Sequence, residues 1–310
     1  MRMLRVACLF AFAAAFQLSA QTNTPPVSKP LPPTPPDLVM LHDVVYGKGG
    51  AQGLRAEICY SKKVTGPMPG LICVHGGGWM EGSKNSIDLT HFARAGYFAV
   101  SIDYRLSPVA KWPAQIQDCK CAVRWLRANA SQYNVDPARI GLWGGSAGAH
   151  LVDLIATTPN LPEFEGDGGW PGVSTQVKCV IDLFGPVDLT NPPQNAPSIV
   201  NLLNHLFPTP YDQDPATWKN ASPLDHVAAG APPFLIIHGD ADTVVPLAQS
   251  QAFADALTKA GVPNQLIVVH NGIHGLSALR GTKTSPDANA VQRAQFEFLA
   301  KYLTPTPPAK

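Results

Sequence analysis

The segment Ile140-Gly141-Leu142-Trp143-Gly144-Gly145-Ser146-Ala147-Gly148 indicates one particular class of fold. Its apolar half predicts a short strand, and the residues after Ser146 predict a helix over 147–156. A G-x-S-x-G sequence between a strand and a helix is typical of a nucleophile elbow, where a strained turn presents a serine at a helix N-terminus. The alternative is a glycine-rich turn with a capping serine. Ser146 is therefore the candidate nucleophile.

The rest of the chain alternates between short apolar runs and helical patterns. This order favours a mostly parallel eight-stranded sheet with helices on both faces. Right-handed crossovers place the carboxyl ends of such strands on one edge, where active sites lie. The expected strands are 39–46, 54–60, 71–75, 97–103, 139–143, 177–184, 233–238 and 265–269, and the expected helices are 83–95, 113–130, 147–156, 247–260 and 288–302.

The two ends of the chain read as segments outside the folded body. Arg2 and Arg5 precede an apolar run at 6–16, which predicts a signal peptide over 1–20. The run is shorter than the ~20 residues of a spanning helix, although a membrane anchor is the alternative. We expect a Pro-rich linker at 21–37, a catalytic domain at 38–303 and a Pro-rich tail at 304–310. The protein is then secreted or periplasmic, with no stable membrane association after cleavage.

The charge balance and the cysteine content of the chain limit which partners and cofactors we expect. The chain has 310 residues and a net charge of +1, from 23 Lys and Arg against 22 Asp and Glu. This balance gives no electrostatic reason to expect nucleic acid as a partner. No His-Glu-x-x-His or Cys-x-x-Cys sequence occurs, so we expect no metal and no cofactor. Five cysteines follow the expected signal peptide, and this odd number predicts a free thiol or an intermolecular bond.

A glycine-rich segment predicts an oxyanion-binding loop. His75-Gly76-Gly77-Gly78-Trp79 follows the expected strand 71–75. Glycines allow backbone N–H groups to point into a cavity, and a tetrahedral intermediate needs such donors. We expect the N–H groups of Gly77, Gly78 and Ala147 to be those donors and Trp79 to contact the substrate. His75 is expected to be structural.

A serine needs a base and an orienting acid, in the chain order Ser, Asp, His for this fold. Asp240 and Asp242 both follow the expected strand 233–238, and Asp242 is the preferred acid because it lies deeper in the loop. His270 and His274 both follow the last expected strand. His274, on a Gly-flanked loop, is the preferred base.

Together these motifs resemble the α/β-hydrolase superfamily and the secreted carboxylesterases near hormone-sensitive lipase. They are more similar to the bacterial carbohydrate esterases typified by bifunctional acetylxylan and feruloyl esterases. Gly145 stands where the lipase-like family has Asp, and Ala149-His150 stands where that family has a second Gly. The long N-terminal helical cap of that family is also lacking, so a small irregular lid at 191–225 is the candidate cover.

The resemblance implies a serine esterase that cleaves short-acyl or feruloyl esters of plant polysaccharide, with a small-molecule or polysaccharide ester as its substrate. Trp218 and Tyr211 are available to stack on sugar rings, and only 199–207 offers a short apolar helix. We therefore expect a shallow cleft that prefers acetyl to octanoyl esters. The alternatives are a general short-chain or lipase-like carboxylesterase, a kynurenine-formamidase-like amide hydrolase, an exopeptidase and a non-catalytic binding protein. The sequence carries no signal for the oligomeric state.

Overall fold

The computed structural model describes residues 33–159, 161–190 and 197–304. The expected signal peptide, most of the expected linker and residues 305–310 of the expected tail lie outside the described residues. All helices and strands belong to the unit that begins at Thr34.

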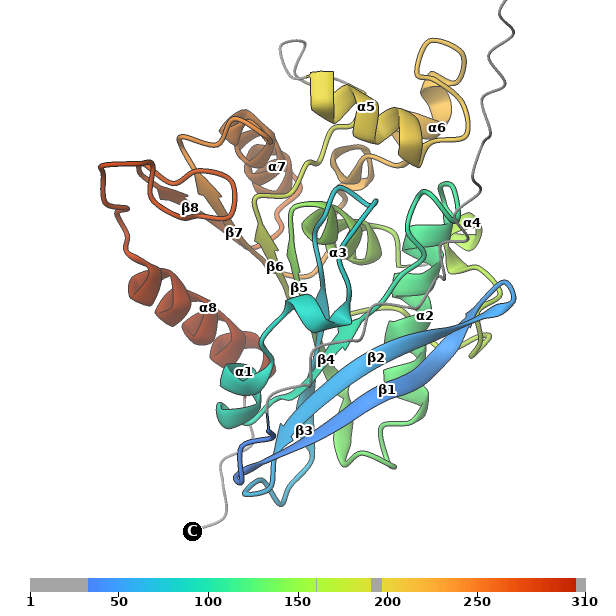
Figure 1. Ribbon diagram of the computed structural model, residues 1–310, viewed down its shortest axis with the longest axis vertical. Helices are drawn as coiled ribbons and strands as arrows, with labels where there is room; N and C mark the ends of the chain where they lie inside the picture. Colours follow the sequence, from blue (N-terminus) through green and yellow to red (C-terminus); the bar gives the residue numbers. More distant parts are fainter. Residues whose placement is uncertain (1–32, 160, 191–196, 305–310) are drawn as a thin grey trace, which may run out of the picture. The chain divides into compact units, whose positions relative to one another are not determined.

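Eight strands form one sheet in the order β1-β2-β4-β3-β5-β6-β7-β8 (Figure 1). The pairs β1–β2 and β2–β4 are antiparallel, and every other neighbouring pair is parallel. The expected mostly parallel eight-stranded sheet is thus confirmed. The strands are β1 (Leu38–Gly49), β2 (Gln52–Ser61), β3 (Met68–Val74), β4 (Phe98–Ile102), β5 (Val135–Gly145), β6 (Val180–Leu183), β7 (Phe234–Gly239) and β8 (Asn264–Val269).

Helices cover both faces of the sheet. Alternate residues along β3 show the division, because Ile72 and Val74 join one buried cluster while Leu71 and Cys73 join the other. The first cluster includes α2 (Ala114–Ala128), α3 (Ala147–Thr157) and α7 (Leu247–Lys259), and the second includes α1 (Thr90–Arg94) and α8 (Ala288–Leu303). The remaining helices are η1 (Lys84–Ser86), α4 (Pro162–Glu165), α5 (Pro197–Leu206), α6 (Pro215–Asn220) and η2 (Pro223–His226).

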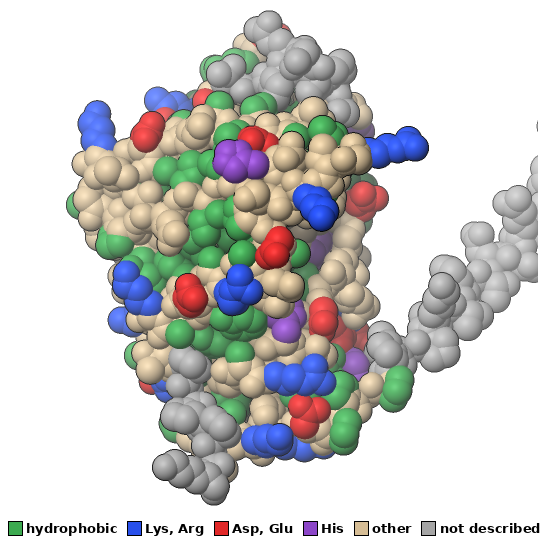
Figure 2. Space-filling model, turned by 90° about the vertical axis from the view of Figure 1, so that its left-hand side faces the viewer, with side chains coloured by type: hydrophobic (Ala, Val, Ile, Leu, Met, Phe, Trp, Pro, Cys, Tyr) green, Lys and Arg blue, Asp and Glu red, His purple; other side chains and the backbone are tan. Residues whose placement is uncertain are grey.

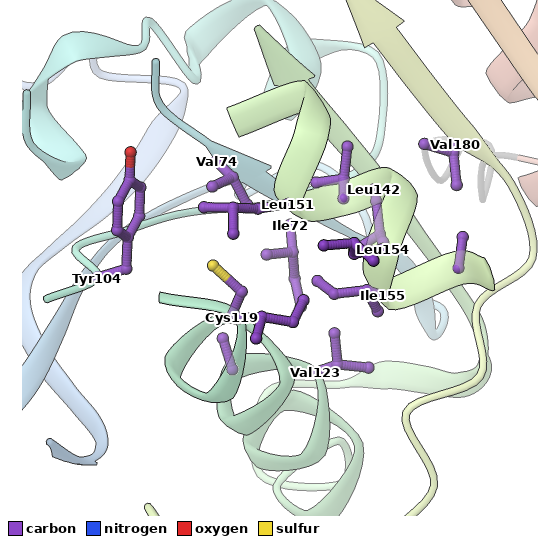
Figure 3. Packing of buried hydrophobic residues seen from close by; sticks show 14 of the residues in the cluster. Ile72, Val74, Tyr104, Cys119, Val123, Leu142, Leu151, Leu154, Ile155 and Val180 are labelled. Atoms are coloured by element: carbon purple, nitrogen blue, oxygen red, sulfur yellow. The ribbon is translucent and has the colours of Figure 1, made fainter. Parts of the chain in front are cut away.

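The core beneath the serine is tightly packed. Figure 3 shows Leu151 and Leu154 of α3 beside Leu142 of β5 and Cys119 of α2, and all four are fully buried. Because α3 begins directly after Ser146, this packing fixes the position of the serine relative to the sheet.

The five cysteines of the described residues are all free and buried, so this part of the chain contains no disulfide. Burial raises the pKa of Cys121 to about 11, and the pKa of Cys59 likewise. These thiols are therefore protonated at neutral pH and act as small apolar side chains.

One expected helix is wrong. The sequence predicts a continuous helix over 83–95, but the structure contains η1 and α1 with extended backbone at Ile87 between them. The reason is local, since Ser83 caps η1 and the Asp88 carboxylate accepts a hydrogen bond of 2.9 Å from the Thr90 N–H. Ser83 therefore begins η1, while the Asp88 hydrogen bond holds the turn that leads into α1, whose N-cap residue Leu89 receives no side-chain cap.

The surface carries mixed charge. On the face shown in Figure 2, Lys and Arg side chains lie among Asp and Glu side chains, in line with the net charge of +1. Among the residues that the structure describes, none of the helices is both long enough and apolar enough to cross a bilayer.

Candidate active site

The turn between β5 and α3 holds Ser146 in a conformation that L-residues rarely adopt. Its φ is 55° and its ψ is −122°. The glycines on either side permit a close approach of strand and helix. A Cβ on Gly144 would lie 2.4 Å from the Gly148 carbonyl oxygen, and a Cβ on Gly148 would lie 2.1 Å from the Val74 carbonyl oxygen. The expected nucleophile elbow therefore has the strained geometry that exposes a serine side chain.

Three side chains from three separate loops meet at this turn. The Ser146 Oγ lies 3.0 Å from the His274 Nε2, and the His274 Nδ1 lies 2.7 Å from the Asp242 Oδ2. A carboxylate oxygen only accepts, so Nδ1 carries the proton and Nε2 is free to accept the serine proton. This arrangement can remove a proton from a nucleophilic hydroxyl and stabilise the imidazolium that forms.

The Asp242 carboxylate is fully buried and receives several donors. Its Oδ1 accepts hydrogen bonds from the N–H groups of Val244 at 2.8 Å and Val245 at 3.0 Å. Burial raises the pKa of Asp242, but hydrogen bonds from His238, His274 and the backbone outweigh it and hold that pKa well below its usual value. Asp242 is therefore ionised wherever His274 needs a negative partner.

The alternative candidates for the base and the acid do not contact Ser146. His270 and Asp240 form their own ion pair, with 2.8 Å between Nδ1 and Oδ2, and the His270 side chain is 67% exposed. His75 stacks on Tyr104 and contacts the Gly76 carbonyl, so it shapes the glycine loop. The structure thus brings His274, and neither of these histidines, to Ser146.

The glycine loop lies beside the serine, as the sequence predicts. Gly77, Gly78 and Ala147 line the same cavity as Ser146. Gly77 and Gly78 have φ values of 105° and 57°, and among the described residues their N–H groups donate no backbone hydrogen bond. The Ala147 N–H belongs to the first turn of α3, where helices have no internal acceptor. These three N–H groups can therefore receive a negatively charged oxygen.

A cavity of about 720 Å³ surrounds Ser146 and His274. Its lining is largely apolar and includes Trp143, Phe184 and Leu202. Trp79 belongs to the lining, but its indole is only 3% exposed and donates a hydrogen bond of 3.2 Å to the buried His150. Trp79 therefore shapes the wall of the cavity rather than offering an open ring face. The cavity stands at the position of the expected cleft beside Gly77 and Trp79, and its volume leaves room for a small acyl group.

The lid differs from its prediction in two ways. Helix α5 is ten residues long, and Ile199, Leu202 and Leu203 on it line the cavity. Its apolar face is therefore continuous with the site. Trp218 is 2% exposed because its ring stacks on Phe207 at 4.3 Å between centroids, so it is unavailable to a sugar. Residues 191–196 of the expected lid lie outside the described part of the chain.

Tyr211 remains exposed and lies in a second hollow. This hollow has a volume of about 520 Å³ and is also lined by Lys219 and Asp225. Asp188 lines both the hollow and the serine cavity, so the two spaces adjoin. The hollow is bordered by an aromatic ring and charged groups, whereas the serine cavity is mostly apolar.

Two features of the site were missed by the sequence reasoning. The Phe184 ring meets the His274 ring edge to face at 4.8 Å between centroids, with φ of 47° at Phe184. His238 is fully buried, and its Nε2 lies 3.2 Å from the Asp242 Oδ2. The signal for His238 was its place in His238-Gly239-Asp240-Ala241-Asp242, where only the two acids were considered.

A buried pair of acids lies behind the elbow. Asp153 of α3 and Asp182 of β6 are both fully buried and interact with each other. Burial raises the pKa of Asp153, and the neighbouring Asp182 raises it further. Burial also raises the pKa of Asp182, while a hydrogen bond from the Gly185 N–H opposes this. Burial and the repulsion between two neighbouring carboxylates both disfavour ionisation, so the pair carries less than two negative charges.

No group of three or more His, Cys, Asp or Glu side chains in the described residues is arranged to hold a metal ion.

The family of the chain follows from comparison with known proteins. The BD-FAE family model matches residues 56–257. The chain belongs to the BD-FAE family. This confirms the resemblance to serine esterases of the α/β-hydrolase type.

Individual relatives agree with the family. Esterase LipC of Mycobacterium tuberculosis is 34% identical over 270 residues, which are 82% of this chain and 66% of LipC. A truncated carbohydrate esterase from gut microbiota superposes with a TM-score of 0.72 at 29% identity, covering 85% of this chain and 95% of that structure. Esterase Est2 of Thermogutta terrifontis superposes with a TM-score of 0.70 at 28% identity, covering 89% and 96%.

The fold, the family and these relatives are those of carboxylic ester hydrolases. The chain spans just under two thirds of the length of LipC. The solved structures are matched over nearly their whole length.

Proposed function

We propose that this protein hydrolyses carboxylic esters with Ser146 as nucleophile, His274 as general base and Asp242 as the orienting acid. The observation that carries the proposal is the unbroken chain of hydrogen bonds, 3.0 Å from Ser146 to His274 and 2.7 Å from His274 to Asp242. All three groups meet beside a cavity that can hold an acyl group.

The chemistry proceeds through an acyl-enzyme. The Ser146 Oγ bonds to the ester carbonyl carbon while its proton passes to the His274 Nε2, and the carbonyl oxygen becomes an oxyanion held by N–H groups of Gly77, Gly78 and Ala147. The C–O bond to the alcohol then breaks, and the alcohol leaves with the proton from Nε2. Water repeats these steps, releasing the acid and restoring the serine hydroxyl. Each oxyanion donor accounts for about 10²–10³ in kcat.

We further propose that the protein is exported and that the substrates are acetyl or feruloyl esters of plant polysaccharide. The signal-like residues 1–20 support export, and the similarity to a carbohydrate esterase supports the substrate class. The hollow at Tyr211 supports it as well, since an exposed aromatic ring beside charged side chains is suited to a sugar. An acyl group next to Ser146 would leave the sugar on the Asp188 side of the cavity.

One observation favours a second candidate, a general or lipase-like carboxylesterase. The apolar face of α5 covers the serine cavity through Ile199, Leu202 and Leu203. An apolar helix over an apolar cavity also suits a longer acyl chain, with no requirement for a sugar.

The test combines a variant with two substrate series. Ser146→Ala should lower kcat by about 10⁴–10⁶ with the fold intact, because alanine removes only the hydroxyl from a half-buried side chain that faces the cavity. On p-nitrophenyl esters from C2 to C12, the proposal expects higher kcat/KM for acetyl than for octanoyl. A maximum at C8 or longer contradicts the carbohydrate proposal and favours the second candidate. Activity on acetylated xylan and methyl ferulate, compared with an aryl formamide, separates the ester and amide alternatives.

A further inference from the structure

A second chain of hydrogen bonds reaches the same carboxylate oxygen as the Ser146 chain. His238 lies near the end of β7 and is fully buried. Its Nδ1 lies 2.7 Å from the Ser250 Oγ on α7. Its Nε2 lies 2.8 Å from the Val245 carbonyl oxygen and 3.2 Å from the Asp242 Oδ2. The buried carboxylate therefore lies between two imidazoles, each of which contacts a serine hydroxyl.

These contacts assign the hydrogens of His238. A carbonyl oxygen only accepts, so the His238 Nε2 carries the hydrogen and shares it between Val245 and Asp242. In this tautomer the His238 Nδ1 has a free lone pair, which accepts the hydroxyl hydrogen of Ser250. Ser250 thereby holds the histidine in the orientation that directs Nε2–H toward the Val245 carbonyl oxygen, with the Asp242 Oδ2 only 3.2 Å from the same nitrogen.

We propose that His238, held by Ser250, is a positioning residue for Asp242 in the ester hydrolysis. The inference rests on the proposed function, since it assigns to Asp242 the role of orienting acid. With His238 in place, the Asp242 Oδ2 receives two imidazole donors, while its Oδ1 receives two backbone N–H groups. Rotation of the carboxylate would break several of these bonds, so its direction toward His274 is fixed.

The shared donor also sets how strongly Asp242 attracts a proton. A hydrogen bond from His238 stabilises the negative charge on Oδ2, so less of that charge acts on His274. Without this donor, Asp242 would favour the protonated form of His274 more strongly. The acidic limb of the kcat/KM profile should then move to higher pH, and the carboxylate, held by one donor fewer, would orient the His274 ring less well.

Two other acidic side chains lie near His238, on the neighbouring strand β6 and on helix α3. Asp182 of β6 interacts electrostatically with His238, and Asp153 of α3 lies against Asp182. Burial holds both carboxyls toward the protonated state, which limits the charge they present to His238. Asp242, from the loop after β7, therefore presents the charged carboxylate that contacts the His238 Nε2, at 3.2 Å.

The experiment compares His238→Leu, which has no donor, with His238→Gln, whose amide reaches the position of Nε2. His270→Gln is the matched control, because His270 also pairs with an aspartate, Asp240. This pair is exposed and contacts neither Asp242 nor His274. For each variant, kcat and KM for p-nitrophenyl acetate are measured from about pH 5 to pH 9, together with thermal unfolding.

We expect His238→Leu to lower kcat by about 10–100-fold with little change in KM. A loss of this size is typical when the hydrogen-bond partner behind a metal ligand is removed, and His238 supports the Asp242 carboxylate in the same way. The acidic limb of its kcat/KM profile should move to higher pH. His238→Gln should restore most of kcat and the position of the limb, and His270→Gln should behave as the wild type. A folded His238→Leu with the wild-type profile overturns the proposal, as does a His238→Gln variant that is equally impaired.

If His238→Leu does not fold, the Ser250→Ala variant tests the positioning role of His238 instead. It leaves the imidazole in place but removes the hydroxyl that orients it, so kcat should fall and the acidic limb should shift in the same direction. An unchanged profile in folded Ser250→Ala overturns the proposal. Ser146→Ala is run in parallel, because activity that survives in that variant refutes the proposed function itself rather than the role of His238.

Discussion

Replacing Gly148 by alanine tests whether the close approach of α3 to β3 positions the serine. The new Cβ would lie 2.1 Å from the Val74 carbonyl oxygen and 2.7 Å from the His75 carbonyl oxygen. Both neighbours are backbone atoms of the sheet and of the glycine loop, so no side chain can move aside. Relief requires α3 to separate from β3 by about 1 Å or more before a normal contact distance is reached.

This displacement sets the expected magnitude. Forcing an extra methyl group into a packed site costs about 1–3 kcal/mol, and each kcal/mol lowers the melting temperature of a domain this large by about 2–4 °C. Because α3 carries Ser146 at its first turn, the same displacement moves the Oγ relative to His274 and the glycine loop. A misplacement of about 1 Å can cost 10²-fold in rate, and we expect a loss of that size in kcat/KM.

The assay is hydrolysis of p-nitrophenyl acetate combined with thermal unfolding followed by circular dichroism. Gly145→Ala is the matched control from the same motif, since its Cβ would meet only the Phe184 ring at 3.5 Å, an ordinary contact. We expect Gly145→Ala to retain most of its stability and activity. Wild-type activity and melting temperature in Gly148→Ala would refute the reasoning, and equal damage in both variants would show that the turn excludes any Cβ.

Three further predictions concern titratable groups. His274→Ala should lower kcat about as far as Ser146→Ala while His270→Ala has little effect, and inactivity confined to His270→Ala would move the base to that residue. Asp242→Asn should cost about 10⁴ in kcat because the amide favours the wrong tautomer of the histidine, and a loss of that size at Asp240→Asn alone would transfer the acid there. Asp153→Asn concerns stability: the raised pKa of Asp153 means that wild-type stability falls as pH rises from the unfolded pKa through the folded one. The difference in melting temperature between Asp153→Asn and the wild type should therefore shift in favour of the variant from pH 5 to pH 8, and a constant difference would contradict the raised pKa of Asp153.

Local sequence was sufficient for the elements that carry the chemistry. The alternation of short apolar runs with helical patterns predicted the six strands of the parallel part of the sheet, because residues buried on both faces must be apolar. The two N-terminal strands were predicted from the glycine turn between them. The Gly-Gly-Ser-Ala-Gly motif predicted the elbow for a similar reason, since only glycine tolerates backbone as near as 2.1 Å. The split of the expected helix at 83–95 was missed because the Asp88 carboxylate, which accepts a hydrogen bond from the Thr90 N–H, interrupts a helical pattern that begins at the Ser83 cap.

The choice between paired candidates depended on distances across the fold. Asp240 and Asp242 are two residues apart, and His270 and His274 are four residues apart. The two members of each pair offer the same chemistry in the sequence. Folding matches His270 with Asp240 and His274 with Asp242, and only the second pair reaches Ser146.

The sequence alone therefore established the fold class, the strained serine turn and the glycine loop, because these depend on backbone constraints within a few residues. The lining of the cavity by α5, the burial of Trp218 and the contact of His238 with Asp242 were established only by the tertiary structure. Each of these depends on which segments, distant along the chain, pack against one another. The period of hydrophobic residues shows that a side chain is buried, but it does not show against which partner.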